Sequence, residues 1–205
     1  MAENFPPSRV ELGALDKKRT ALFLCDIQEK YKDVMHRFPE VVANTKKLVQ
    51  GCIHMQVPYV VSEQSPAVLG RTVKEIETYE AVAVVSKFKF SMIVPEMEQH
   101  LETLCDGSLA SVILCGMETH IEIEQTAIDL LSRGIQVHIV ADCCTTRSID
   151  DRNLALQRLS QIGCFICTCE NVLFKLLESK EHPKFRVVAQ LVKRVSQSNA
   201  LSALF

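Results

Sequence analysis

Residues 20–26 read Thr-Ala-Leu-Phe-Leu-Cys-Asp, an uninterrupted apolar run that ends in a carboxylate. A short run without alternating polar positions is typical of a strand that is buried on both faces of a parallel sheet. Amphipathic stretches separate this run from similar ones downstream, which indicates an α/β fold of three layers with helices on both faces of a six-stranded parallel sheet. The other five runs cover residues 58–62, 81–86, 110–115, 136–141 and a last one near 164–169.

The segments between these runs carry the residues that begin and end helices. Pro39 is expected to begin the first helix, and Gly134 and Gly163 are expected to end two later ones. Helical spacing of apolar residues also predicts helices over 172–177 and 185–195, beyond the last strand.

The chain is sized for one compact domain. It has 205 residues, 47% of them hydrophobic, and seven glycines, which is enough for a single large core. We therefore expect an N-terminal lead-in over 1–18, one domain over 19–197 and a C-terminal tail over 198–205.

The charge balance argues against a nucleic-acid partner. With 23 basic and 25 acidic residues the net charge is -2, and only 184–194 is locally basic.

No apolar run reaches the 18 to 20 residues that span a bilayer, and the first residues lack the layout of a secretory signal. We expect no membrane partner and a cytoplasmic location, with mitochondrial import as the alternative.

The chain has nine cysteines, an odd number, and most lie within strand-like runs. This pattern favours reduced, buried thiols over disulfides. Cys164, Cys167 and Cys169 form a cluster, but only the last two would share a side of an extended strand, and no histidine is near them in sequence. No structural zinc is therefore predicted.

Three polar residues follow predicted strands and are candidates for a catalytic site. Asp26 follows the first run, Lys87 follows the third with Lys89 as a competitor, and Glu122 begins the helix after the turn at Gly116. In an open parallel sheet the ligand site lies at the carboxyl ends of the strands. Two carboxylates and an ammonium brought together there could hold and move protons.

Each of these residues also has a purely structural explanation. Asp26 could cap the segment after its strand, and either lysine could be a solvated strand end. Glu122 could simply interact with the dipole of its helix. The residue types alone leave both interpretations open.

Five segments together resemble the isochorismatase-like (cysteine hydrolase) family, and more closely its isochorismatase domain-containing protein 2 branch. They are Leu-Phe-Leu-Cys-Asp-Ile-Gln-Glu-Lys at 22–30, the loop 62–70, Lys-Phe-Lys-Phe-Ser-Met at 87–92, Leu-Cys-Gly-Met-Glu at 114–118 with its continuation to residue 131, and 134–142. The resemblance implies a Rossmann-like sheet with strand order 3-2-1-4-5-6. It also selects Lys87 over Lys89.

The resemblance further implies roles for site residues. Amide-cleaving members use an aspartate as general base, a lysine as its partner and a cysteine as nucleophile, and Asp26 and Lys87 match the first two. Glu122 occupies the position of the cysteine. Two backbone N–H groups near a non-proline cis peptide form the family's oxyanion hole, which here implies a cis bond at Met117-Glu118 and donors from Glu118 and Glu122.

By the same resemblance, a substrate pocket is expected to include six further residues: Gln28, Glu63, Gln64, Phe90, Met117 and Thr119. The metal-using nicotinamidase branch carries histidines after the second strand, and 62–70 contains none. We therefore expect no metal and no cofactor. The family also implies assembly into a homo-oligomer.

Three functions remain open from the sequence. The first is thiol-independent hydrolysis of a small metabolite, because true isochorismatases protonate a vinyl ether and some of them lack the cysteine. Glu122 beside Asp26 would then raise the pKa of one carboxyl group, with Asp26 as the general acid and Lys87 orienting the substrate or stabilising charge. Ordinary amidase chemistry is not expected, because a carboxylate is a poor nucleophile toward an amide.

The second function is that of a catalytically inactive family member, in which Glu122 is an ion-pair partner and the protein binds a small molecule or another protein. The third is nucleic-acid processing. It is disfavoured, because the chain shows no interleaving of aromatic and basic residues of the kind that stacks bases.

Overall fold

The computed structural model describes residue 10 and residues 12–193. Within them lies a six-stranded sheet with the order β3-β2-β1-β4-β5-β6, and all neighbouring strands pair in parallel. The predicted fold class and strand order are confirmed. The strands are β1 (Thr20–Cys25), β2 (Tyr59–Gln64), β3 (Ala83–Lys87), β4 (Ser111–Met117), β5 (Gln136–Thr145) and β6 (Phe165–Cys167).

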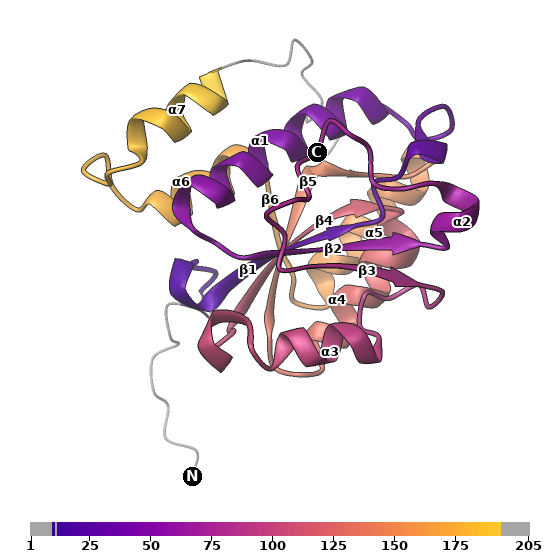
Figure 1. The fold of residues 1–205 in the computed structure, drawn as a ribbon, viewed down its shortest axis with the longest axis horizontal. Coiled ribbons are helices and arrows are strands. Elements are labelled where there is room, and N and C mark those ends of the chain that lie inside the picture. The colour runs from indigo at the N-terminus through magenta and orange to yellow at the C-terminus, as the bar shows by residue number, and fades with distance from the viewer. Residues whose placement is uncertain (1–9, 11, 194–205) are drawn as a thin grey trace.

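Helices cover both faces of this sheet (Figure 1). One face carries α1 (Phe38–Met55), α6 (Cys169–Leu177) and α7 (Phe185–Lys193), and the other carries α3 (Pro95–Leu101), α4 (Glu124–Leu131) and α5 (Ile149–Gln161). Shorter helical segments are η1 (Lys17–Arg19), η2 (Glu29–Tyr31), α2 (Pro66–Leu69), η3 (Leu104–Gly107) and the π-helical turn η4 (Thr119–Ile123).

Several boundaries differ from the prediction. β2 continues to Gln64, so Glu63 and Gln64 are buried strand residues and not part of a loop. β5 continues to Thr145, because Cys143 and Cys144 extend its buried run past a register shift against β4. Helices α2 and α3 were not predicted. The last expected residues of the final helix, and the tail 198–205, lie outside the described residues.

The core lies between the sheet and its two helical layers. Every residue of β1 and of β4 is buried, as the uninterrupted apolar runs predicted.

All nine cysteines are free, and all of them except Cys105 are buried. Burial raises the pKa of the Cys115 and Cys143 thiols well above their ordinary value, so these residues fill the core as small apolar side chains. In the part of the chain that the structure describes, no helix is both long and apolar enough to cross a membrane.

Gly116 lies in β4 directly beside the end of β1. It pairs with Cys25 and has a φ of +132°, which residues with a side chain rarely adopt. A Cβ atom placed there would be 1.9 Å from the carbonyl oxygen of Cys25. This close approach brings the chain beyond Gly116 next to the end of β1, where Asp26 lies.

We expect Gly116→Ala to lower the free energy of unfolding by about 3 kcal/mol or more, because it adds overpacking against backbone to an unfavourable φ. Gly134→Ala is the matched control. Its φ is +74°, but no atom lies within 4 Å of the added Cβ, so only the backbone cost of about 1–2 kcal/mol applies. Denaturant unfolding of both variants measures the difference, and equal losses would contradict the steric explanation.

Candidate active site

Asp26 and Lys87 form a buried ion pair at the carboxyl ends of β1 and β3. The chain turns at Asp26 through a φ of +53°, and the Lys87 Nζ atom donates to Asp26 Oδ2 at 2.6 Å. The Ser62 hydroxyl, from the neighbouring strand β2, donates to Asp26 Oδ1 at 2.7 Å. Both side chains of the pair are 0% exposed. The structure therefore brings together two of the three predicted polar residues.

All N–H groups of the Lys87 ammonium have acceptors within the protein. Besides Asp26 it reaches the Gln64 Oε1 atom at 2.8 Å, the carbonyl oxygen of Phe90 at 2.8 Å and that of Lys89 at 3.2 Å. Four acceptors surround a group that has three protons. Lys89 instead forms a partly exposed ion pair with Asp129 at 2.7 Å, outside this cluster.

Glu122 lies in the π-helical turn η4 between β4 and α4, and its side chain turns back toward the start of that turn. Its Oε2 atom accepts a hydrogen bond from the backbone N–H of Glu118 at 2.6 Å, and its own backbone N–H also bonds the carboxylate. The peptide bond between Met117 and Glu118 is cis. The two N–H groups predicted to form an oxyanion hole are thus occupied by the carboxylate of Glu122.

The surroundings shift both carboxyl groups. Burial raises the pKa of Glu122 to about 7, although the two backbone N–H groups oppose this shift, and the charge of Asp26 adds to it. Burial also raises the pKa of Asp26, against the lowering effect of Lys87 and Ser62. Burial thus raises the pKa of both carboxyl groups in the cluster formed by Asp26, Lys87 and Glu122.

Tyr31 and Arg147 also lie at this cluster, and sequence reasoning missed both. Arg147 follows β5, and its Nε atom donates to Glu118 Oε2 at 3.1 Å. Burial, and then the charges of Glu122 and Asp26, raise the pKa of Tyr31. The only available signal was that Tyr31 directly follows the 22–30 segment of the family resemblance.

Three of the six predicted pocket residues use their side chains within the protein. The Gln28 side chain bonds the backbone of Gln64 and the carbonyl oxygen of Gly70. The Gln64 side chain joins Lys87 to the carbonyl oxygen of Phe88. The Glu63 carboxylate receives hydrogen bonds from Arg71 at 2.8 Å and from Thr72. These residues hold the strand ends together.

The other three differ in exposure. Met117 is fully buried, and the Thr119 hydroxyl donates to the carbonyl oxygen of Thr145 at 3.1 Å. Phe90 is 48% exposed, next to the carbonyl group that holds Lys87. Of the six, Phe90 is the side chain most available to a ligand.

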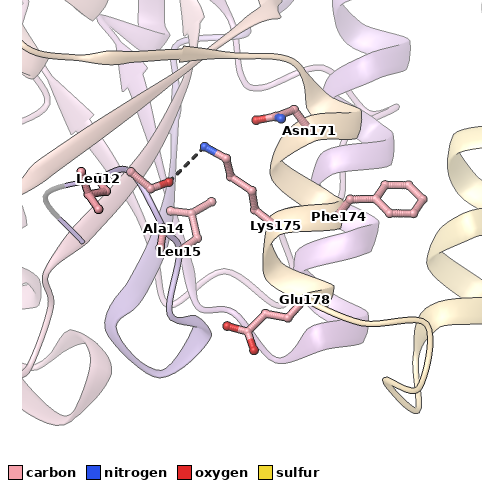
Figure 2. A pocket seen from close by; sticks show the side chains of 8 residues that line it. Leu12, Ala14, Leu15, Asn171, Phe174, Lys175 and Glu178 are labelled. Carbon is pink, nitrogen blue, oxygen red and sulfur yellow. Dashed lines mark hydrogen bonds between the residues drawn. The ribbon is translucent and has the colours of Figure 1, made fainter. Parts of the chain in front are cut away.

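Cavities in the described part of the chain lie away from the cluster. One, of about 570 Å³, lies between residues 12–15 and α6, where Lys175 donates to the carbonyl oxygen of Gly13 (Figure 2). Another, of about 150 Å³, lies between the start of α1 and the end of β5. No predicted site residue lines either cavity. Among the residues with described positions, no group of three or more His, Cys, Asp or Glu side chains is placed to hold a metal ion.

A family model described as the isochorismatase domain matches residues 20–171. The chain belongs to the isochorismatase family. Isochorismatase domain-containing protein 2 of Bos taurus is 42% identical over 198 residues, which cover 97% of this chain and 95% of that protein. The similarity to this branch of the isochorismatase family, expected from the sequence, is confirmed.

Two further relatives extend the comparison. Isochorismatase domain-containing protein 1 of Danio rerio is 43% identical over 89% of this chain, and the chain spans 64% of that protein's length. A solved structure, named MAR1 ribonuclease from Caenorhabditis elegans, is 32% identical with a TM-score of 0.86 and covers 94% of this chain and 99% of its own. The chain thus has the hydrolase fold of the isochorismatase family.

Proposed function

We propose that this protein hydrolyses a small metabolite by acid catalysis without a thiol, with Glu122 as the proton donor. The observation that carries the proposal is the buried carboxyl group of Glu122, held at 2.6 Å by the Glu118 N–H and with a pKa raised by burial to about 7. A general acid works best when its pKa is close to the working pH.

The position of Glu122 argues against acyl transfer. Its carboxylate already bonds the N–H groups that would stabilise the oxyanion of a tetrahedral intermediate. A carboxylate is also a poor nucleophile toward an amide. Both facts favour a bond that breaks after protonation, such as the vinyl ether that the resemblance to true isochorismatases implies.

The proposed reaction has three steps. Glu122 transfers its proton to the vinyl carbon, which produces an oxocarbenium ion. Water adds to that ion and gives up a proton, which restores protonated Glu122. The resulting hemiketal breaks into a ketone and an alcohol. No thiol, metal or external redox partner is needed.

Asp26 and Lys87 are proposed to stabilise the site around this donor. Both oxygen atoms of Asp26 already accept short hydrogen bonds, from Lys87 and from Ser62. Asp26 was expected from the sequence to be the general acid, but we propose Glu122 for that role, because the hydrogen bond from the Lys87 ammonium favours the ionised form of Asp26. The negative charge of the Asp26 carboxylate would also stabilise the positively charged oxocarbenium ion.

A catalytically inactive, ligand-binding protein is the second candidate. The saturated hydrogen bonding of Lys87 and the occupied N–H groups of Glu118 and Glu122 favour it, because both are what a neutralised charge network would show.

The expected homo-oligomer also stays a prediction. The outward side chains of β3 and its flanks that an assembly would cover are Tyr79, Val82, Val84 and Phe88, all at least 45% exposed.

RNA cleavage is included in the test, because the Caenorhabditis elegans relative is named a ribonuclease. The net charge of -2 and the lack of interleaved aromatic and basic residues in the sequence disfavour it.

The test compares wild type and Glu122→Cys on a 2-alkoxyacrylate vinyl ether, a simple amide and single-stranded RNA between pH 5.5 and 8.5. We expect the wild type to act on the vinyl ether, with a rate that falls about tenfold per pH unit above pH 7 as Glu122 loses its proton. Glu122→Cys should lose this activity. Equal vinyl ether rates in both proteins, or cleavage of RNA alone, would contradict the proposal, and no activity in either would favour the ligand-binding protein.

A further inference from the structure

The cluster offers few donors to an anionic ligand. The ammonium of Lys87 is fully used, and the backbone N–H groups of Glu118 and Glu122 are occupied. The guanidinium of Arg71 is paired with the Glu63 carboxylate at 2.8 Å. A negatively charged group on a ligand therefore has to be recognised elsewhere at the rim of the site.

Arg147 has the donors that the other cations lack. Its Nε atom bonds Glu118, and its two Nη groups make no hydrogen bond within residues 10 and 12–193. The side chain is 64% exposed, and it is paired with Glu118, whose backbone N–H holds the proposed proton donor Glu122. Two parallel N–H groups of a guanidinium fit the two oxygen atoms of a carboxylate.

Tyr31 lies close enough to the site for its charge to act on Arg147. Its hydroxyl makes no hydrogen bond in the described part of the chain, and the charges of Glu122 and Asp26 act on it. The segment that follows Tyr31 is tied to the segment before Arg147. The His36 N–H donates to the carbonyl oxygen of Thr146 at 2.9 Å, and the Thr145 hydroxyl donates to the carbonyl oxygen of His36 at 2.5 Å.

We propose that Arg147 and Tyr31 are the specificity-determining residues of the site and recognise the carboxylate of a small monocarboxylic acid. The inference rests on the proposed function, because it places the acid-labile bond of that substrate at Glu122. Glu118 connects the two parts of the site. Its carboxylate holds Arg147 and its N–H holds Glu122, so the distance between the recognition group and the proton donor is set by one residue.

The test measures binding of benzoate and of benzamide, which match in size and differ in charge, by NMR titration at pH 6. We expect wild type to bind benzoate at least tenfold more tightly than benzamide. Arg147→Gln should remove this preference, and Tyr31→Phe should weaken benzoate binding about threefold. The matched control is Arg158→Gln, because Arg158 is 60% exposed and is also paired with a glutamate, Glu124, and its replacement should leave the preference unchanged.

Equal binding of benzoate and benzamide by wild type, absence of benzoate binding, or equal effects of Arg147→Gln and Arg158→Gln would overturn the inference. Thermal unfolding of each variant checks that its fold is retained. Binding needs no turnover, so the two proposals fail separately. A lasting benzoate preference without vinyl ether hydrolysis would overturn only the proposed function, whereas hydrolysis of vinyl ethers with no benzoate preference would overturn only the recognition by Arg147 and Tyr31.

Discussion

Replacing Lys87 by methionine is expected to lower the free energy of unfolding by about 3–5 kcal/mol at pH 7. The substitution leaves the Asp26 carboxylate without the ammonium that lies 2.6 Å away, and both side chains are 0% exposed. An unpaired buried charge is far more costly than the pair itself. The carbonyl groups of Lys89 and Phe90 lose their donor as well. Urea unfolding, monitored by circular dichroism, gives the loss directly.

Lys89→Met is the matched control for this prediction. Lys89 makes the same kind of ion pair, with Asp129 at 2.7 Å, but its side chain is 51% exposed. An exposed pair contributes about 0–1 kcal/mol, so this variant should be nearly as stable as wild type. The double variant Asp26→Asn with Lys87→Met should recover part of the loss, because no charge is then left unpaired. Similar losses for Lys87→Met and Lys89→Met would contradict the role of burial.

Glu122→Gln is expected to lower kcat for acid-catalysed hydrolysis by about 10²–10⁴-fold, which is the usual contribution of a general acid. Glutamine keeps the shape of the protonated side chain and can still accept the Glu118 N–H, but it has no proton to transfer. The rate of vinyl ether hydrolysis at pH 6 measures the loss. Glu124→Gln, two residues along and paired with Arg158, should retain full activity.

Glu122→Gln should also become more stable relative to wild type as pH rises. The pKa of Glu122 rises from 4.5 to about 7 on folding, so the ionised group destabilises the fold. This destabilisation is absent below about pH 4.5, grows as pH rises to 7 and is complete above 7, at about 3 kcal/mol for such a change of pKa. The stability difference between Glu122→Gln and wild type should therefore be more favourable at pH 8 than at pH 4.5. A difference that does not depend on pH would contradict the raised pKa.

The sheet could be predicted from the sequence because its strands are buried on both faces. Short, uninterrupted apolar runs such as 20–25 and 111–115 are typical of such strands, whereas the strand order came from the family resemblance. The end of β5 could not be placed, because Cys143 and Cys144 continue the buried run across a register shift. Helix α3 was missed, since its seven residues are mostly polar and bury only Met97.

Asp26, Lys87 and Glu122 could be named as candidates from the sequence, but their hydrogen bonds could not. The strand-end positions of Asp26 and Lys87 follow from parallel topology, and their pairing is what that topology produces. The turn of the Glu122 side chain back to the Glu118 N–H depends on the π-helical turn η4, and no residue pattern indicates that geometry. Tyr31 and Arg147 reach the site from segments that are adjacent only in the folded chain.

The left-handed backbone at Asp26, with its φ of +53°, limits which mutants can be interpreted. Aspartate and asparagine tolerate this conformation better than other residues with a side chain, because their short polar groups can bond locally. An alanine or valine at this position would confound the loss of a charge with added backbone strain, and its phenotype could not be assigned to either cause. Asparagine separates the two effects, so it is the substitution from which the chemistry of this carboxylate should be judged.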